Sequence, residues 1–553
     1  MSSAVPPADP GPTPPGFPPP PPEPPPAGEP SAAPTLPPVL GGLMRGTFFL
    51  GLKTTLAVAI AFVSIPMVQH HLGKGLNGAY VFAWNFGFLQ FLLEFGMSSA
   101  LQRHVSETLG RGDRAGVNRA IACGMGFYTA MAATQVVILV GVAYLVVPLT
   151  KFRGAEAGLI VQLLWLQAIT APVFGLAAVI SSVLQGARRY DFFPRLELAV
   201  VAIRFALLVV GLRLGVDFFA IVVAQTAVQV GLLIGPGLWV MIRGLGYVPH
   251  YRGARWSDFA GLLRVSLYLF LLQLSVVLAD QLDILVLGFA LADADPGPAI
   301  TTYQNVSKPF FQTRQTGWTL AYLVMPAVVS LAAVRDERSL ERVKYDGPRY
   351  LAGVILPVAL LAATYAETFL TLWVGPEFAA DAPLLRLFLV GTIPLLISVQ
   401  VQMMIGMGRI RVVALAAIAG AIINLPLSYY LTRRIGVAGV IWGTVLTTLF
   451  SNLLIPGVHL YRVLAIDART TLVRTLGPPA AGALALVAAT WALRRGFAPG
   501  AAADRGWLRY APFAAHLAVG CLAYLAGYLA TPTGRADLAL LARKLPGRRR
   551  HVA

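Results

Sequence analysis

The sequence consists mainly of apolar segments that are each long enough to cross a membrane as a helix. A hydrocarbon core of about 30 Å needs about 20 residues of α-helix. The segments are continuous rather than alternating, which favours helices over a β-barrel, because a helix satisfies its own backbone hydrogen bonds in lipid. We therefore expect an all-α polytopic membrane protein. About fourteen transmembrane helices are predicted, at residues 46–68, 78–99, 119–148, 159–184, 194–214, 217–242, 262–290, 303–333, 351–373, 384–406, 412–432, 437–461, 472–493 and 508–530.

The composition excludes several other classes of protein. Of the 553 residues, 57% are apolar and 12% are charged. The net charge of +18 lies mostly in short connections, a placement typical of membrane orientation rather than of nucleic-acid binding. The two cysteines, Cys123 and Cys521, lie in apolar runs without further ligands, so we expect neither a disulfide framework nor a thiolate metal site. No cofactor is expected.

The N-terminal segment differs from the rest of the chain. Its first 38 residues contain 18 prolines and no Lys or Arg. This composition cannot form a core, and it lacks the basic start of a signal peptide. We expect residues 1–42 to be a disordered, partly polyproline II tail in the cytoplasm. It is either a PxxP docking ligand or a passive tether.

The distribution of Lys and Arg predicts the orientation in the membrane. Alternate connections and the tail carry 28 basic residues on one side and 11 on the other. The richer side is expected to face the cytoplasm, so both termini of this inner-membrane protein should be cytoplasmic. The basic residues between Arg494 and Arg509 make the orientation of the last two helices the least certain part. Arg386 is expected to reach the nearer membrane surface.

An internal repeat relates the first twelve segments. Tyr303 follows Tyr80 by 223 positions, and Asp336 follows Asp113 by the same number. Six segments per half predict a parallel repeat, with substrate sites between the halves. The alternative is that such turns are simply common where helices leave a membrane. The predicted units are the tail 1–42, an N-lobe 43–242, a C-lobe 243–461, two further helices in 462–530 and a basic cytoplasmic tail 531–553.

Charged residues inside the apolar segments are the main candidates for function. Each costs roughly 2.5–3.5 kcal/mol at the bilayer centre and is retained mainly where it faces a polar interior. The intramembrane charges are Lys53, Glu94, Arg204, Asp280, Asp283, Arg314 and Arg386. Polar stripes at helical spacing accompany them, with Ser266, Gln273 and Asp280 in one segment and Lys308, Gln312 and Gln315 in the next.

Structural interpretations remain open for these charges. Arg204 and Arg314 either line a cavity or form ion pairs with Glu94, Asp280 or Asp283 across a helix interface. Lys53 either lines the cavity or extends to the cytoplasmic surface.

No catalytic constellation is evident elsewhere in the sequence. His70 and His71 lack a third ligand, so a metal site is not expected there. No phosphate-binding GxxxxGK[ST] motif occurs.

Several short motifs in a fixed order resemble the polysaccharide transporter family of Wzx-type oligosaccharide flippases. This family belongs to the superfamily that also contains MATE multidrug exporters and the lipid II flippase. The resemblance covers about residues 43–461. Its motifs lie at residues 72–80, 94–103, 184–190, 283–288, 372–378 and 436–443.

The resemblance implies two six-helix lobes around a central cavity that opens alternately to the two sides. The implied activity is outward movement of a polyprenyl-diphosphate-linked oligosaccharide for surface polysaccharide synthesis. The residues expected to bind the headgroup are Lys53, Arg204, Arg314, Gln273 and Gln312. Those expected to act in coupling or charge pairing are Glu94, Asp280 and Asp283. The partners are this glycan and membrane lipids, and a complex with a polymerase or glycosyltransferase is left open.

Two other functions compete with this interpretation. A MATE-like exporter of cationic molecules would need an acidic cavity, whereas the intramembrane candidates comprise four basic and three acidic residues. A polytopic glycosyltransferase or polymerase usually has acidic residues in the first outer loop, and residues 69–77 contain none. We therefore expect a transporter rather than an enzyme.

Overall fold

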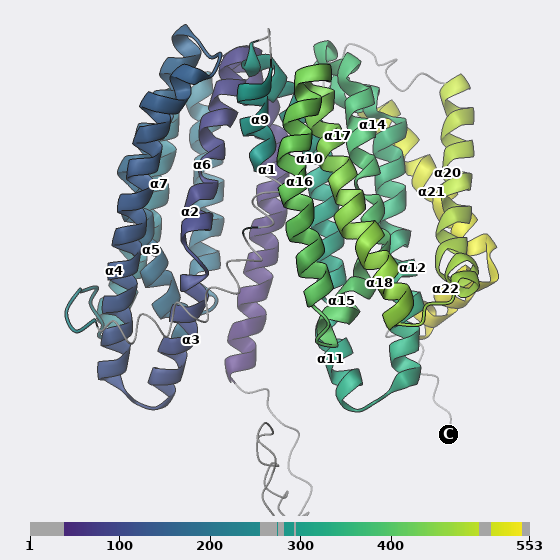
Figure 1. The fold of residues 1–553 in the computed structure, drawn as a ribbon, viewed down its shortest axis with the longest axis horizontal. Helices are drawn as coiled ribbons and strands as arrows, with labels where there is room; N and C mark the ends of the chain where they lie inside the picture. Colours follow the sequence, from purple (N-terminus) through teal and green to yellow (C-terminus); the bar gives the residue numbers. More distant parts are fainter. Residues whose placement is uncertain (1–37, 255–273, 275–280, 292–294, 497–509, 545–553) are drawn as a thin grey trace, which may run out of the picture.

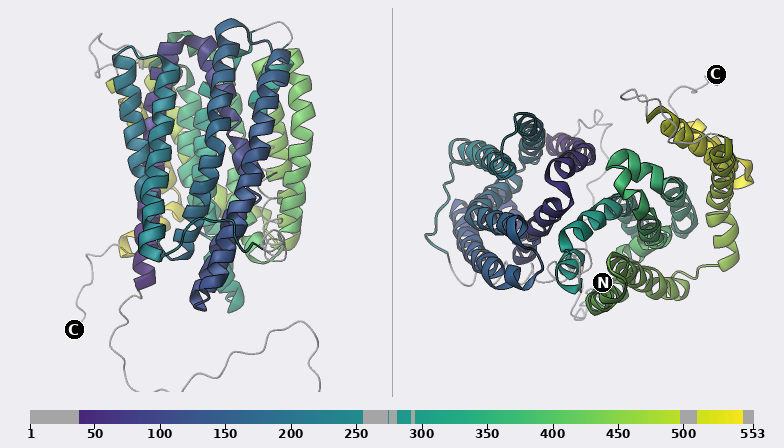
Figure 2. Two further views of the ribbon diagram at one scale, coloured as in Figure 1. Left: turned by 90° about the vertical axis from the view of Figure 1, so that its left-hand side faces the viewer. Right: turned by 90° about the horizontal axis from the view of Figure 1, so that it is seen from above.

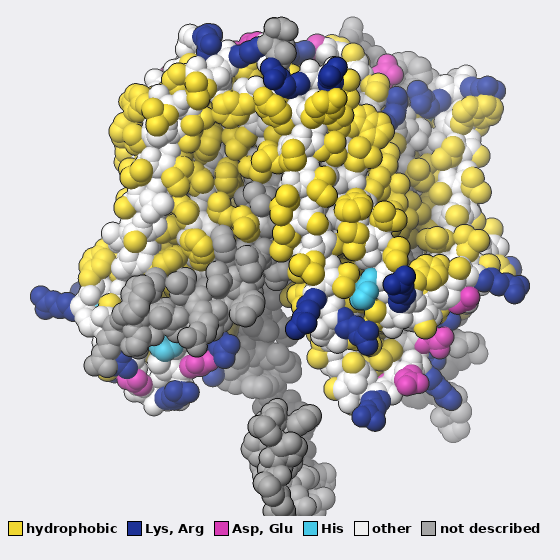
Figure 3. All heavy atoms as spheres, in the orientation of Figure 1, with side chains coloured by type: hydrophobic (Ala, Val, Ile, Leu, Met, Phe, Trp, Pro, Cys, Tyr) yellow, Lys and Arg dark blue, Asp and Glu magenta, His cyan; other side chains and the backbone are white. Residues whose placement is uncertain are grey.

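The structure is a computed structural model that describes residues 38–254, 274, 281–291, 295–496 and 510–544. Its ordered elements are helices, and no strand occurs among the described residues. Eleven helical stretches are long and apolar enough to cross a membrane. Figure 3 shows a broad band of apolar side chains across the middle of the molecule, with Lys, Arg, Asp and Glu gathered toward its two ends. The all-helical membrane fold predicted from the sequence is confirmed.

The first group of helices lies on the left of Figure 1. Gly73 interrupts the long first helix with φ 72° and ψ 174°, and the chain then turns back toward the other end. The helices of this group are α1 (Pro38–Asn85), α2 (Phe88–Leu93), α3 (Met97–Gly110), α4 (Arg114–Gly141), α5 (Gly154–Gly186), α6 (Phe192–Arg213) and α7 (Phe218–Trp239).

A second group stands beside the first, and Figure 2 shows the two as separate bundles when seen from above. Helix α10 lies against α1 where the groups meet. The helices of the second group are α9 (Leu282–Ala290), α10 (Pro296–Tyr322), α11 (Met325–Ala333), α12 (Glu337–Thr364), α13 (Ala366–Trp373), α14 (Ala382–Val390), α15 (Ser398–Gly406), α16 (Arg411–Ile435), α17 (Val437–Leu449) and α18 (Ile455–Val463).

The end of the chain forms a third group, which packs on the outside of α12. It contains α19 (Ala468–Thr470), α20 (Gly477–Gly496), α21 (Ala511–Ala530) and α22 (Pro532–Lys544). The buried Arg349 of α12 donates through Nε and Nη2 to Asp537 of α22, at 3.0 and 2.6 Å. This ion pair holds α22 at the same end of the molecule as the start of α1 (Figure 1).

The eleven candidate spans among the described residues can be compared with the fourteen transmembrane helices predicted from the sequence. The first apolar stretch, Gly51–Gly110, covers two predicted segments. Helix α6 is not among the eleven, because Arg195, Glu197 and Arg204 interrupt its apolar sequence. Most of the predicted segment 262–290 lies outside the described residues. The exact number of fourteen therefore stays a prediction, as do the boundaries of the predicted lobes.

The predicted repeat has a local structural counterpart. Asp113 accepts a hydrogen bond from Gly116 N at 2.7 Å and caps α4, while Asp336 accepts one from Ser339 N at 3.1 Å and caps α12. The residue before each cap has a left-handed backbone, with φ 70° at Gly112. Its counterpart in the second half has φ 55° although it is an arginine. The same helix–turn–helix geometry therefore occurs in both halves, 223 positions apart.

Candidate substrate cavity

A cavity of about 960 Å³ lies between the first two groups of helices. Its walls come from α1, α2, α6, α7, α9 and α10, with Gln281 just before α9. Three basic side chains line it, Arg204, Lys308 and Arg314. Several amides, hydroxyls and aromatic rings accompany them, whereas no Asp or Glu occurs among the described residues of the wall. The described part of the wall is therefore basic.

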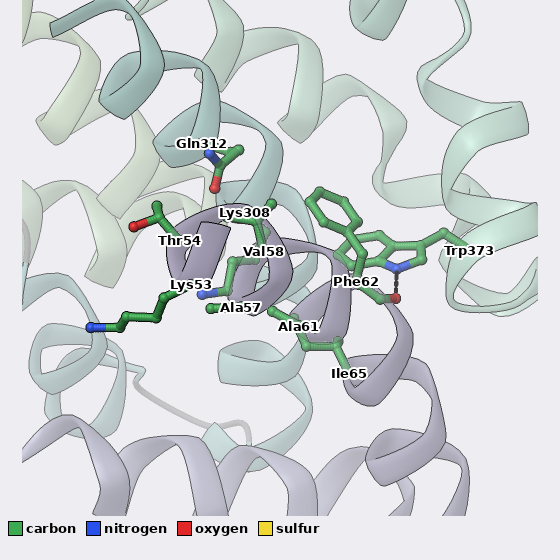
Figure 4. A pocket seen from close by; sticks show the side chains of 10 residues that line it. All are labelled: Lys53, Thr54, Ala57, Val58, Ala61, Phe62, Ile65, Lys308, Gln312 and Trp373. Atoms are coloured by element: carbon green, nitrogen blue, oxygen red, sulfur yellow. Dashed lines mark hydrogen bonds between the residues drawn. The ribbon is translucent and has the colours of Figure 1, made fainter. Parts of the chain in front are cut away.

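A smaller cavity of about 330 Å³ adjoins the first and shares Lys308 with it. Its walls are largely apolar, and Phe62 and Trp373 form one end (Figure 4). The Trp373 ring nitrogen donates to the Phe62 carbonyl at 2.7 Å, which joins α13 to α1. Lys53 and Gln312, both predicted to bind substrate, also line this cavity. We call it the apolar slot.

Arg204 lies near the middle of α6 and is held by the neighbouring helix α7. Its Nη1 donates to Gln229 Oε1 at 2.6 Å, and Gln225 Nε2 donates to the Arg204 carbonyl at 2.8 Å. These neutral partners fix the side chain without cancelling its charge. The sequence prediction of a cavity-facing Arg204 therefore agrees with its position in the wall.

Arg314 lies on α10 against two aromatic rings. Its guanidinium carbon is 5.3 Å from the ring centre of Phe310 and 5.0 Å from that of Phe311. Such contacts orient an arginine side chain and keep its charge. Arg314 therefore lies in the wall of the larger cavity with its guanidinium against these rings.

Lys308 is a cavity residue that was not among the predicted binding residues. It lies twelve residues into α10, which places it about 18 Å along the helix at 1.5 Å per residue. Its side chain is exposed to the cavity and lines both compartments. The signal in the sequence was the spacing of Lys308, Gln312 and Gln315, which places all three on one helix face.

Lys53 has an acidic partner that was not among the predicted site residues. Its Nζ lies 2.7 Å from Glu197 Oε2 on α6. The side chains are 29% and 36% exposed, so the ion pair is partly shielded from water. Figure 4 shows that the Lys53 ammonium points away from Lys308.

Two of the predicted acidic residues, Asp283 and Glu94, are described but are not among the residues that line this basic wall. Asp283 is fully buried, and the hydroxyls of Tyr303 and Thr444 donate to its Oδ2 at 2.7 and 2.6 Å. Asn424 Nδ2 donates to the Thr444 hydroxyl at 3.3 Å. Glu94 accepts a hydrogen bond from the Tyr128 hydroxyl at 2.9 Å.

Two further predicted residues, Gln273 and Asp280, lie outside the described residues. No group of three or more His, Cys, Asp or Glu side chains suited to a metal ion occurs in the described part of the chain.

One end of the cavity is closed by direct contact between α1 and α10. Asn77 Nδ2 donates to Thr301 Oγ1 at 3.1 Å and to Gln304 Oε1 at 3.0 Å. The Thr301 hydroxyl donates to the Lys74 carbonyl at 2.7 Å. The backbones also touch here, since a Cβ built on Gly78 would lie 1.9 Å from the Gly297 carbonyl oxygen. We call these residues the outer contact, because they lie at the predicted outer end.

A comparison with known families identifies the first half of the chain. The sequence model of the family described as "Polysaccharide biosynthesis protein" matches residues 43–309. The match covers a little under half of the chain. The resemblance found in the sequence motifs is thus confirmed. No curated protein sequence matches the chain.

Solved structures with a similar fold cover most of the chain. The structure described as "Lipid II flippase MurJ, inward closed conformation" has a TM-score of 0.66 at 13% identity, covering 89% of this chain and 100% of the other. An inward-facing multidrug resistance MATE family transporter of the MOP superfamily has a TM-score of 0.56, also at 13% identity, covering 76% and 100%. At this identity the similarity establishes a shared fold.

Proposed function

We propose that the protein is a flippase that moves a polyprenyl-diphosphate-linked oligosaccharide from the cytoplasmic to the outer leaflet by alternating access. The observation that carries the proposal is the wall of the larger cavity, which presents three basic side chains and no acidic side chain among its described residues. The polysaccharide biosynthesis family and a fold shared with a lipid II flippase support it. The membrane would be the cytoplasmic membrane, with both termini on the cytoplasmic side.

The headgroup would bind through its diphosphate. Arg204 and Arg314 offer planar guanidinium groups that match phosphate oxygens in pairs, whereas Lys308 supplies a compact point charge. The amides of Gln304 and Gln315 on the same wall suit sugar hydroxyls. Binding by these groups replaces the hydration that the headgroup loses when it enters the membrane.

The apolar slot would receive the first part of the polyprenyl chain. Its walls combine Ala57, Val58 and Phe62 with Trp373, which packs beside Phe62, and Lys308 lines both the slot and the larger cavity. A diphosphate at Lys308 would therefore have its charged end in the larger cavity and its isoprenoid end in the slot.

The membrane potential favours outward movement of such a headgroup. Two negative charges crossing about 100 mV, inside negative, gain roughly 4.6 kcal/mol at about 2.3 kcal/mol per charge. The same potential also favours the reset of the empty transporter, because its basic cavity then moves toward the negative inside.

Asp283 would bind a cation that assists this reset. It is buried, and Tyr303 connects it directly to the cavity wall. Two nearby oxygens on α16, Asn424 Oδ1 and Ser428 Oγ, have no hydrogen-bond partner in the described structure. Oxygen ligands of this kind suit a small hard cation. Asp283→Asn should remove any dependence of translocation on a cation gradient.

The alternative function is export of small cationic molecules, which the shared fold with a MATE transporter allows. The basic wall argues against it, because a cation in this cavity would meet like charges.

Translocation in liposomes tests the proposal. The purified full chain is reconstituted, and the fraction of a fluorescent polyprenyl-diphosphate oligosaccharide that reaches the other leaflet is followed by quenching. Arg204→Ala and Arg314→Ala should each slow it at least tenfold. Arg213→Ala, an exposed arginine at the end of the same helix α6, is the matched control. Normal rates in both cavity variants would end the assignment.

A further inference from the structure

The ion pair between Lys53 and Glu197 occupies a critical position beside the cavity. It joins α1 to α6 at 2.7 Å, and Lys53 belongs to the wall of the apolar slot while its ammonium points out of it. The ammonium of Lys308 faces the same slot. Glu197 thus holds one of the two lysines away from the place where a diphosphate would bind.

Whether a phosphate group can displace the Glu197 carboxylate from Lys53 depends on how much negative charge the phosphate group carries. An ion pair at this exposure shifts an equilibrium by only up to about fivefold. A diphosphate carries more charge and makes stronger charge-assisted hydrogen bonds than one carboxylate does. A multiply charged headgroup near Lys308 can therefore draw Lys53 away from Glu197, whereas a weakly charged headgroup cannot.

We propose that Glu197 holds Lys53 back until a diphosphate displaces it, so that breaking of this ion pair depends on the substrate. Only a diphosphate then recruits Lys53 to the slot, and its arrival releases the tie between α1 and α6. Glu197 acts through Lys53 and does not touch the substrate. The inference rests on the proposed function, because it requires that the cavity binds a diphosphate.

Helix α6 supplies a matched control for this proposal. Asp191, the residue just before α6, lies six positions before Glu197 and forms an ion pair with Arg195 at 2.5 Å. Arg195 also stacks on the ring of Phe49, 4.9 Å away. Asp191→Asn therefore removes one negative charge from α6, as Glu197→Gln does, but it frees no lysine at the cavity wall.

The test measures binding of inorganic pyrophosphate and of orthophosphate to the full chain in nanodiscs of neutral lipid. Calorimetric titration gives both dissociation constants for the wild type, Glu197→Gln, Lys53→Gln, the double variant and Asp191→Asn. We expect Glu197→Gln to tighten pyrophosphate binding about two- to fivefold. It should tighten orthophosphate binding less, because orthophosphate seldom displaces the carboxylate and therefore gains little when the carboxylate is removed. The preference for pyrophosphate should therefore rise, and Asp191→Asn should leave it unchanged.

Three results separate the inference from the proposed function. Unchanged constants in Glu197→Gln would overturn the role of Glu197, while Arg204→Ala and Arg314→Ala could still lose binding and support the flippase. An equal gain from Glu197→Gln with or without Lys53 would also overturn it, since general electrostatics would then explain the effect. A wild type that binds no pyrophosphate would overturn both the inference and the diphosphate assignment.

Discussion

Replacing Gly78 by alanine should prevent the outer contact from closing. A Cβ at this position would lie 1.9 Å from the Gly297 carbonyl oxygen, where ordinary contact begins at 3.4 Å. The neighbouring backbone atoms are also within 2.6 Å, so no flexible side chain can move aside. Helices α1 and α10 must therefore separate by roughly 1.5 Å.

This separation breaks the hydrogen bonds that accompany the contact. The two bonds from Asn77 measure 3.1 and 3.0 Å and would lengthen to about 4.5 Å, beyond hydrogen-bonding distance. At about 0.5–1.5 kcal/mol each, their loss disfavours the closed end by about 1–3 kcal/mol. The population with this end open should rise about 5- to 150-fold.

Cysteine labelling from outside measures that population. Gln315, exposed on the cavity wall, is replaced by cysteine, and the exposed Cys521 is changed to alanine. A membrane-impermeant maleimide should then react 5- to 150-fold faster when Gly78→Ala is present. Gly158→Ala on α5 is the matched control, because a Cβ there meets no atom within 4 Å. Equal labelling rates with and without Gly78→Ala would refute the reasoning.

Three further predictions follow from other parts of the molecule. Asp537→Ala removes one of the carboxylate partners of the buried Arg349 and should destabilise the protein by about 3 kcal/mol. This loss should appear as a lower thermal unfolding midpoint in detergent. The hydroxyl and amide of Ser339 hold the pKa of Asp336 below its ordinary value. Stability from this cap is present above about pH 4 and is lost as the pH falls through the lowered pKa, so Asp336→Ala should lower the midpoint at pH 7 but not at strongly acidic pH. Lys308→Gln should weaken pyrophosphate binding about 10- to 150-fold, whereas Lys308→Arg should retain most of it; calorimetry distinguishes the two outcomes.

The sequence predicted the fold well because membrane helices depend on local properties. An apolar run of spanning length forms a helix whatever its neighbours are, because lipid offers the backbone no other partner. The repeat was visible through Asp113 and Asp336, whose capping role depends only on the next three residues. Helix α6 forms where a segment was predicted at 194–214, although Arg204 and Glu197 reduce its hydropathy.

The pairing of side chains could not be predicted in the same way. Spacing placed Lys308 on a polar face, but only packing of α1 against α10 shows that this face borders two cavities. Glu197 lies 144 positions from Lys53, and no local pattern relates them. Asp283 was predicted to be an intramembrane charge, but its hydroxyl partners come from other helices and could not be predicted.

Native mass spectrometry of the full chain with polyprenyl diphosphate tests the central claim most directly. The account predicts that the wild type retains polyprenyl diphosphate but releases polyprenol, which has the same tail without the charge. A variant with Arg204, Lys308 and Arg314 all changed to glutamine should lose this preference. Equal retention of both lipids by the wild type, or an undiminished preference in the triple variant, would contradict a basic cavity that recognises the diphosphate.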